Sequence, residues 1–73
     1  MREYLVIIEP VEDGSGFGAY VPDLPDCVAA AKTREETLKL IREAVPWHIE
    51  SLRAHGEPVP APAAQAEHVT VAA

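Results

Sequence analysis

The chain has 73 residues, enough for one domain, and its 12 acidic residues outnumber its 6 basic ones to give a net charge of −6. This charge argues against direct nucleic-acid binding, which depends on Lys and Arg, and it favours a basic protein partner. The single cysteine cannot form an internal disulfide, and the apolar runs are too short to span a membrane. We therefore expect a cytoplasmic protein that gains stability by self-association.

Two strands joined by a hairpin turn are predicted at the start of the chain. Residues 4–9 form a near-continuous apolar run that Pro10 ends, which is typical of a central strand covered on both faces. Asp13-Gly14 is a strong turn signal, because glycine adopts positive φ without steric cost. Residues 17–21 are then predicted to form a second strand, antiparallel to the first.

A proline-rich loop and a short third strand are predicted next. Pro22 and Pro25 each lack a backbone donor and bias the preceding residue away from helix, so residues 22–26 should form a rigid loop. Residues 27–31 are rich in alanine and are predicted to form a short strand. This strand would complete an antiparallel sheet.

A helix is predicted to begin after Thr33, because Thr33 and Glu36 have the spacing of a capping box. Apolar residues then recur at steps of three and four along one face: Leu38, Ile41, Val45, Ile49 and Leu52. Gly56 is suited to ending the helix. Pro46 falls on the polar face, so we expect one bent helix, with two shorter helices as the alternative.

The residues after the helix predict an extended segment and a last strand. Residues 57–64 contain three prolines and should form a polyproline-like crossover. Residues 67–71 alternate and are β-branched at their end, which predicts a fourth strand or a tail that pairs at an edge. Over residues 1–73 the expected fold is a single α+β domain of order β-β-β-α-β. It has a three-stranded antiparallel sheet, one helix packed on one face, and a fourth edge strand.

Four segments, taken in order, carry the motifs of a known family. They are Tyr4-Leu5-Val6-Ile7-Ile8-Glu9-Pro10, Val21-Pro22-Asp23-Leu24-Pro25-Asp26-Cys27, Thr33-x-x-Glu36 and Gly56-Glu57-Pro58-Val59-Pro60-x-Pro62. Together they resemble the HicB-like antitoxin family over residues 4–71. Asp26 stands where that family usually has glycine, and Thr37 stands where it has alanine. We expect Asp26 to preserve the turn, because Asp tolerates the left-handed region better than most residues.

The resemblance implies a truncated ribonuclease-H-like fold and the role of antitoxin in a type II toxin–antitoxin pair. The partner would be a small basic HicA-like toxin, an mRNA interferase, whose active site the antitoxin covers. Many members also carry a DNA-binding domain, but this chain ends two residues after Val71, so DNA binding is not expected. The alternative function is an orphan homo-oligomer with a regulatory or ligand-binding role.

Acidic turns are the candidate contacts for a basic toxin. The expected residues are Asp23, Leu24 and Asp26 in the proline loop, with Glu12 and Asp13 in the hairpin turn. Carboxylates that converge on Mg²⁺ would instead indicate a ribonuclease-H-like nuclease, which is the third function considered. The competing interpretation is that each is simply a solvated turn residue.

Apolar residues outside the core stripe are candidate contacts between copies of the chain in a dimer or tetramer. On the helix these are Leu40 and Trp47, which lie well outside the main stripe. At the end of the chain they are Val69 and Val71, whose backbone would be unpaired at a sheet edge. The competing interpretation is that a wide sheet buries the helix pair and that the tail frays.

No catalytic residue, metal ligand or cofactor is expected. Cys27 is typical of a small buried hydrophobe, and nothing near it in sequence would activate a thiol. His48, His55 and His68 lack the spacing of a metal site. The sequence therefore predicts a binding protein rather than an enzyme.

Overall fold

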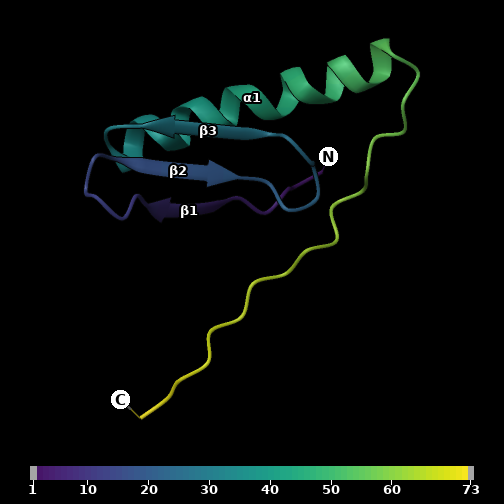
Figure 1. Ribbon diagram of the computed structural model, residues 1–73. Coiled ribbons are helices and arrows are strands. Elements are labelled where there is room, and N and C mark those ends of the chain that lie inside the picture. The colour runs from purple at the N-terminus through teal and green to yellow at the C-terminus, as the bar shows by residue number, and fades with distance from the viewer. Residues whose placement is uncertain (1, 73) are drawn as a thin grey trace.

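The computed structural model describes residues 2–72, which contain three strands and one helix. The elements are β1 (Ile7–Pro10), β2 (Phe17–Tyr20), β3 (Val28–Ala31) and α1 (Arg34–Ala54). The strands form an antiparallel sheet in the order β1-β2-β3, and α1 lies along one face of it (Figure 1). This arrangement confirms the α+β prediction for the sheet and the helix.

The hairpin between β1 and β2 depends on a glycine at its end. Gly16 is buried, and a Cβ atom at this position would overlap the backbone carbonyl oxygen of Ala31 at the end of β3. Glycine therefore lets the hairpin lie directly against the third strand. Gly14, at the tip of the turn, has φ 78° as the sequence predicts for an Asp-Gly turn.

The prediction that the first strand is central and covered on both faces is wrong. β1 is an edge strand, and α1 packs on one face of the sheet. Ile7 pairs with Tyr20, and Tyr20 pairs with Val28, so these three form a row on the opposite face. Tyr20 is 42% exposed and Val28 is 65% exposed. The apolar run in β1 therefore contributes to a sheet face that is largely exposed. It does not contribute to a second buried face.

The core lies between the sheet and α1, and the proline loop contributes to it. Its buried hydrophobic residues are Ala19, Val21, Leu24, Cys27 and Ile41. Leu24 comes from the loop between β2 and β3 and is 1% exposed, so the loop is part of the packed interior. Buried Thr37 donates its hydroxyl to the Thr33 carbonyl at 2.8 Å and lies 3.4 Å from the Phe17 carbonyl. It therefore links the start of α1 to β2.

Both ends of α1 follow the sequence signals. The Glu36 amide donates to the Thr33 hydroxyl, 3.1 Å away, as a capping box requires. The reciprocal bond differs from the expected one, because the Thr33 hydroxyl donates to the Glu36 carboxylate. At the other end, Gly56 has φ 67° and the Glu57 amide donates to the Leu52 carbonyl, which completes a Schellman motif.

Pro46 lies inside α1 without dividing it, so the prediction of a single helix is confirmed. Pro46 is exposed, as expected from its place on the polar face. The carbonyl that loses its partner therefore lies on the solvent side, where the missing bond is least costly. Within residues 2–72, no helix combines the length and the apolar character needed to cross a membrane.

The fourth edge strand is not formed, which corrects the expected order to β-β-β-α. Residues 57–72 contain no helix or strand, and residues 65–72 are exposed. Two contacts hold the earlier part of this segment: the Tyr4 hydroxyl donates to the Pro60 carbonyl, and Asp23 accepts the amide of Ala64. Beyond Ala64 the chain leaves the body of the protein, so residues 67–71 have no neighbouring strand with which to pair (Figure 1).

Candidate functional site

Asp23 has an internal structural role in this fold. Its carboxylate accepts hydrogen bonds from the amides of Ala63 and Ala64, each at 3.0 Å from Oδ2. This clamp ties the proline-rich segment to the loop between β2 and β3. Asp23, which was expected to contact a partner, is therefore bonded within the chain to residues far away in sequence.

The other two predicted residues of this loop have opposite environments. Leu24 is buried in the core, so its side chain offers no surface to a partner. Asp26 is exposed and has φ 67°, which confirms that Asp can occupy the left-handed position where the family pattern has glycine. Of the three loop residues, Asp26 is the one whose carboxylate is presented outward.

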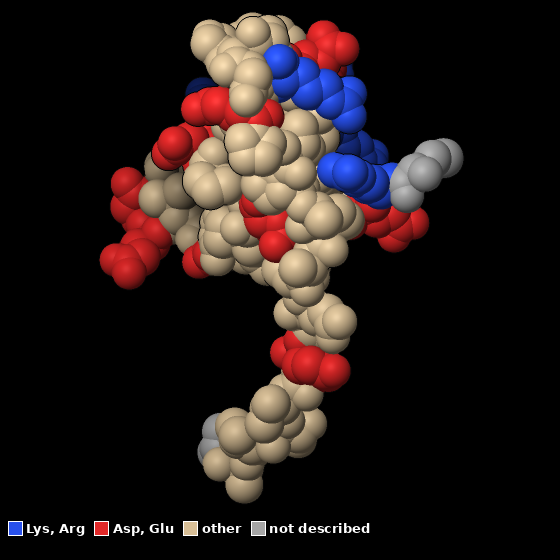
Figure 2. Space-filling model, turned by 90° about the vertical axis from the view of Figure 1, so that its right-hand side faces the viewer, with Lys and Arg blue, Asp and Glu red and all other residues tan. Residues whose placement is uncertain are grey.

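Glu12 and Asp13 lie at the opposite end of the sheet. They occupy the turn between β1 and β2, whereas Asp26 lies in the loop between β2 and β3. The four-residue strand β2 separates the two ends by about 10 Å or more. Figure 2, which views the molecule from the end where the loop between β2 and β3 lies, shows several separate groups of acidic side chains. The predicted acidic contacts therefore form two regions, one at each end of the sheet.

The Asp13 carboxylate is organised by its own turn. The Ser15 amide donates to Asp13 Oδ1 at 2.8 Å. Hydrogen bonds from the Ser15 side chain and backbone lower the pKa of the Asp13 carboxyl below its usual 3.8. The charge at this end of the sheet is thus maintained at every pH near neutrality.

The arrangement of carboxylates does not favour the nuclease interpretation. Two-metal catalysis needs several carboxylates that converge on ions about 4 Å apart. Here the acidic turns are at opposite ends of the sheet, and residues 2–72 contain no group of three or more His, Cys, Asp or Glu placed to hold a metal ion.

An exposed apolar strip lies on α1. Trp47 is 79% exposed and Leu40 is 43% exposed. They are seven positions apart, so they share a side of the helix, roughly 100–120° around from buried Ile41. The structure thus leaves this pair outside the core, contrary to the interpretation that a wide sheet buries it.

The C-terminal valines are also exposed. Val69 is 83% exposed and Val71 is 72% exposed, both on the segment that leaves the body of the protein. They are separate from Leu40 and Trp47 in the fold. The residues expected between copies therefore belong to two surfaces, the helix strip and the tail.

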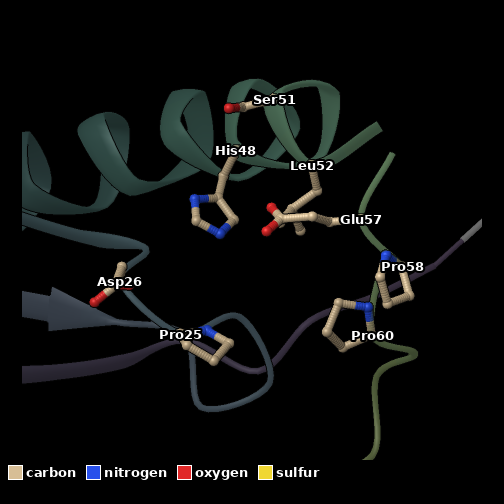
Figure 3. A pocket seen from close by; sticks show the side chains of 8 residues that line it. All are labelled: Pro25, Asp26, His48, Ser51, Leu52, Glu57, Pro58 and Pro60. Carbon is tan, nitrogen blue, oxygen red and sulfur yellow. The ribbon is translucent and has the colours of Figure 1, made fainter. Parts of the chain in front are cut away.

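A pocket of about 440 Å³ lies where the proline loop, the last turns of α1 and the proline-rich segment meet (Figure 3). Asp26 and Pro25 line it from the loop, and His48 from the helix. Glu57 and Pro60 line it from the proline-rich segment. Figure 3 shows the His48 ring and the Glu57 carboxylate pointing toward each other across it, while Ser51 points away. We call this the proline pocket.

The sequence prediction did not include the proline pocket. Glu57 is not among the contacts expected from the sequence, and His48 enters the sequence prediction only as a residue without the spacing of a metal ligand. Glu57 belongs to the Gly56-Glu57-Pro58 motif, which was a signal for that position. Glu57 lines the same pocket as Asp26 because of the tertiary fold, which local sequence patterns do not reveal.

A second pocket of about 440 Å³ lies on the other side of α1 and has a different charge. Arg2 and Arg53 line it together with Glu50, beside Tyr4 and Pro46. Basic groups therefore outnumber acidic ones in this pocket. In the proline pocket, the acidic groups are Asp26 and Glu57, and no Lys or Arg is among the described residues that line it.

Cys27 has the environment of a structural residue. Its side chain is 3% exposed, and burial raises the pKa of its thiol above the usual 9.0. A thiol acts as a nucleophile through its thiolate form, which burial disfavours here. This agrees with its interpretation as a buried hydrophobe.

One family model covers nearly the whole chain, and several relatives are similar to it. Residues 4–72 match the family described as the HicB-like antitoxin of the bacterial toxin–antitoxin system. A UPF0150 protein of Thermoplasma acidophilum is 44% identical over 69 residues, which cover 94% of this chain and 96% of that protein. A UPF0150 protein of Synechocystis is 42% identical over 57 residues, which cover 78% of this chain and 71% of that protein.

One relative carries a functional name. It is antitoxin HicB 1 of Photorhabdus laumondii, which is 36% identical over 59 residues. The match covers 81% of this chain and 37% of that longer protein.

Proposed function

Because the chain belongs to the HicB-like antitoxin family, we propose that it neutralises a small basic toxin by binding over the toxin's active site. The match over residues 4–72 is the observation that carries this proposal. The net charge of −6 supports it, because an acidic surface accelerates encounter with a basic partner. The inhibition is by occlusion and requires no chemistry from the antitoxin.

We further propose that the toxin is a HicA-like mRNA interferase. An RNA-cleaving toxin has a basic surface for its substrate, and an acidic protein competes for that surface. The two exposed acidic regions, Asp26 at one end of the sheet and Glu12 with Asp13 at the other, are the proposed contacts. Asp23 and Leu24 contribute by holding the loop in shape.

Self-association is the second part of the proposal. The exposed apolar side chains of Trp47, Leu40 and Val28 support contacts between copies, in a dimer or tetramer. Val69 and Val71 would extend the sheet of a second copy by pairing at an open strand edge. In this arrangement the antitoxin lies in the cytoplasm and needs no cofactor.

Co-expression with the basic protein encoded beside it tests the function in cells. We expect that protein to arrest growth when expressed alone and the arrest to be relieved when this chain is present. The two proteins should also purify together. Arrest that persists with no recoverable complex would count against the antitoxin role. A stable multimer of this chain that does not bind the basic protein encoded beside it would favour the orphan homo-oligomer.

A further inference from the structure

The proline pocket has a wall that is held in place from both sides. At the end of α1, the Schellman motif fixes the direction in which Glu57 leaves the helix. Farther along, the Tyr4 hydroxyl holds the Pro60 carbonyl, and the Asp23 carboxylate holds the amide of Ala64. Prolines also have fixed φ, so this wall loses little conformational freedom when a ligand binds. The pocket is therefore largely formed before any partner arrives.

The lining of the proline pocket combines apolar walls with two carboxylates. Pro25, Leu52 and Pro60 supply apolar surface, and Asp26 and Glu57 supply negative charge from two different segments. The second pocket has the same volume and lies on the same helix, but Arg2 and Arg53 line it. The two pockets therefore differ mainly in charge, and only the proline pocket is complementary to a cation.

We propose that the proline pocket receives one Arg or Lys side chain from the basic protein that this chain binds. The aliphatic part of that side chain would pack on Pro25 and Pro60, and its charged end would lie beside Glu57, with the charge of Asp26 at the rim of the pocket (Figure 3). The volume of about 440 Å³ is within the range of small-ligand pockets and accommodates a single long side chain. This inference rests on the proposed function for the partner being a protein.

His48 gives the pocket a third polar group. Its ring points into the space toward Glu57 (Figure 3). A neutral imidazole has one nitrogen that accepts a hydrogen bond, and a guanidinium has five N–H donors. Arginine can therefore bond to the Glu57 carboxylate and the His48 imidazole together, whereas the three donors of a lysine lie at a single point. The geometry thus favours arginine over lysine.

The test is an NMR titration of the full chain with Nα-acetyl-arginine methylamide. Its neutral counterpart, Nα-acetyl-citrulline methylamide, has nearly the same shape without the charge. We expect saturable shifts with the arginine compound at Asp26, His48, Leu52 and Glu57. The citrulline compound should produce much smaller shifts at these residues.

A double variant, Asp26→Asn with Glu57→Gln, removes the charge but keeps the shape of the pocket. Both residues are exposed, and Asn tolerates the left-handed backbone at position 26, so the fold should be retained. We expect arginine affinity to fall about tenfold, because the charge-assisted bond to Glu57 and the attraction of the nearby Asp26 charge are lost. The matched control is Glu43→Gln with Glu50→Gln, two exposed positions of α1 outside the proline pocket, which changes the net charge equally and should alter affinity less than about twofold.

Three results would overturn the proposal: shifts centred elsewhere or absent, equal binding of the citrulline compound, or unchanged affinity in the double variant. None of these results depends on a toxin. The pocket could fail this test while the chain still relieves growth arrest, and the antitoxin role could fail while the pocket still binds arginine. The two proposals are therefore separately refutable.

Discussion

Asp23 shows how one carboxylate can hold a segment that has no secondary structure. Its bonds to the amides of Ala63 and Ala64 connect two loops that are far apart in sequence. Such charge-assisted bonds to backbone amides are stronger than neutral ones. From the sequence, Asp23 was expected to contact a partner. An acidic residue in a turn has the same local sequence pattern whether its carboxylate bonds within the chain or to another protein.

Asp23→Ala should release the proline-rich segment. We expect hydrogen exchange at the amides of Ala63 and Ala64 to accelerate at least about tenfold, because they lose their acceptor. The free energy of unfolding should fall by about 1–2 kcal/mol. Exchange measured by NMR, with Asp26→Asn as a control whose exchange is unchanged, checks this. Equal exchange in the variant and the wild type would show that the clamp is not formed in solution.

Cys27 provides a prediction about pH. Burial raises the pKa of its thiol above 9.0, so the folded state favours the neutral form. The resulting stabilisation is fully present below pH 9.0 and is lost as pH rises through the higher folded-state pKa. We expect the thiol to react with iodoacetamide at pH 8 far more slowly in the native protein than in urea. Similar rates in both conditions would contradict its burial.

At the scale of elements, the predictions succeeded where local chemistry determines the structure. The capping box at Thr33, the stop at Gly56 and the Asp-Gly turn each depend on residues within a few positions of one another. Pro46 was placed correctly because its face of the helix follows from the periodicity of the apolar residues. These signals fix the start, the end and the buried side of α1 before any packing is known.

The predictions that failed depend on which elements become neighbours. An apolar run such as that of β1 indicates that both faces of the strand are apolar. It does not indicate whether a second layer of the protein covers the outer face. A β-branched stretch such as residues 67–71 favours an extended backbone, yet it forms a strand only when another strand lies beside it. The proline pocket was missed for the same reason, because only the tertiary structure brings Asp26 and Glu57 to the lining of one pocket.

The apolar strip on α1 makes a prediction about assembly. Trp47 is 79% exposed, so Trp47→Ala should change the stability of a single folded chain by no more than about 0.5 kcal/mol. If the strip joins two copies, the same change should lower the oligomer mass measured by light scattering, because buried Trp dominates many interfaces. Glu43→Ala, an exposed change on the same helix, is the control and should leave the mass unchanged. A multimer of unaltered mass in the Trp47 variant would exclude the strip as an interface.

At the scale of the whole molecule, the small size and the acidic charge both favour a protein that binds a partner or a second copy of itself. A 73-residue domain without a disulfide buries a modest core, and among residues 2–72 five hydrophobic residues are buried in it between the helix and the sheet. Several large hydrophobic side chains outside this core, including Tyr20, Val28 and Trp47, are exposed. A partner or a second copy would cover this surface and add stability by mass action.

The charge predicts how binding depends on salt. An acidic chain that meets a basic toxin should associate faster at low ionic strength, because opposite charges steer encounter over about 10 Å at 0.1 M salt. The two acidic regions at the ends of the sheet would contribute most, since Asp26 and Asp13 are exposed there. The dissociation rate should vary less, because it depends mainly on contacts within the complex.

The most direct test of the antitoxin role is the RNA-cleaving activity of the neighbouring basic protein, measured as this chain is added. The account predicts that cleavage falls in proportion to added chain and stops near a fixed stoichiometry, with the complex isolated at that ratio. Cleavage that continues undiminished at a large excess of folded chain would contradict it.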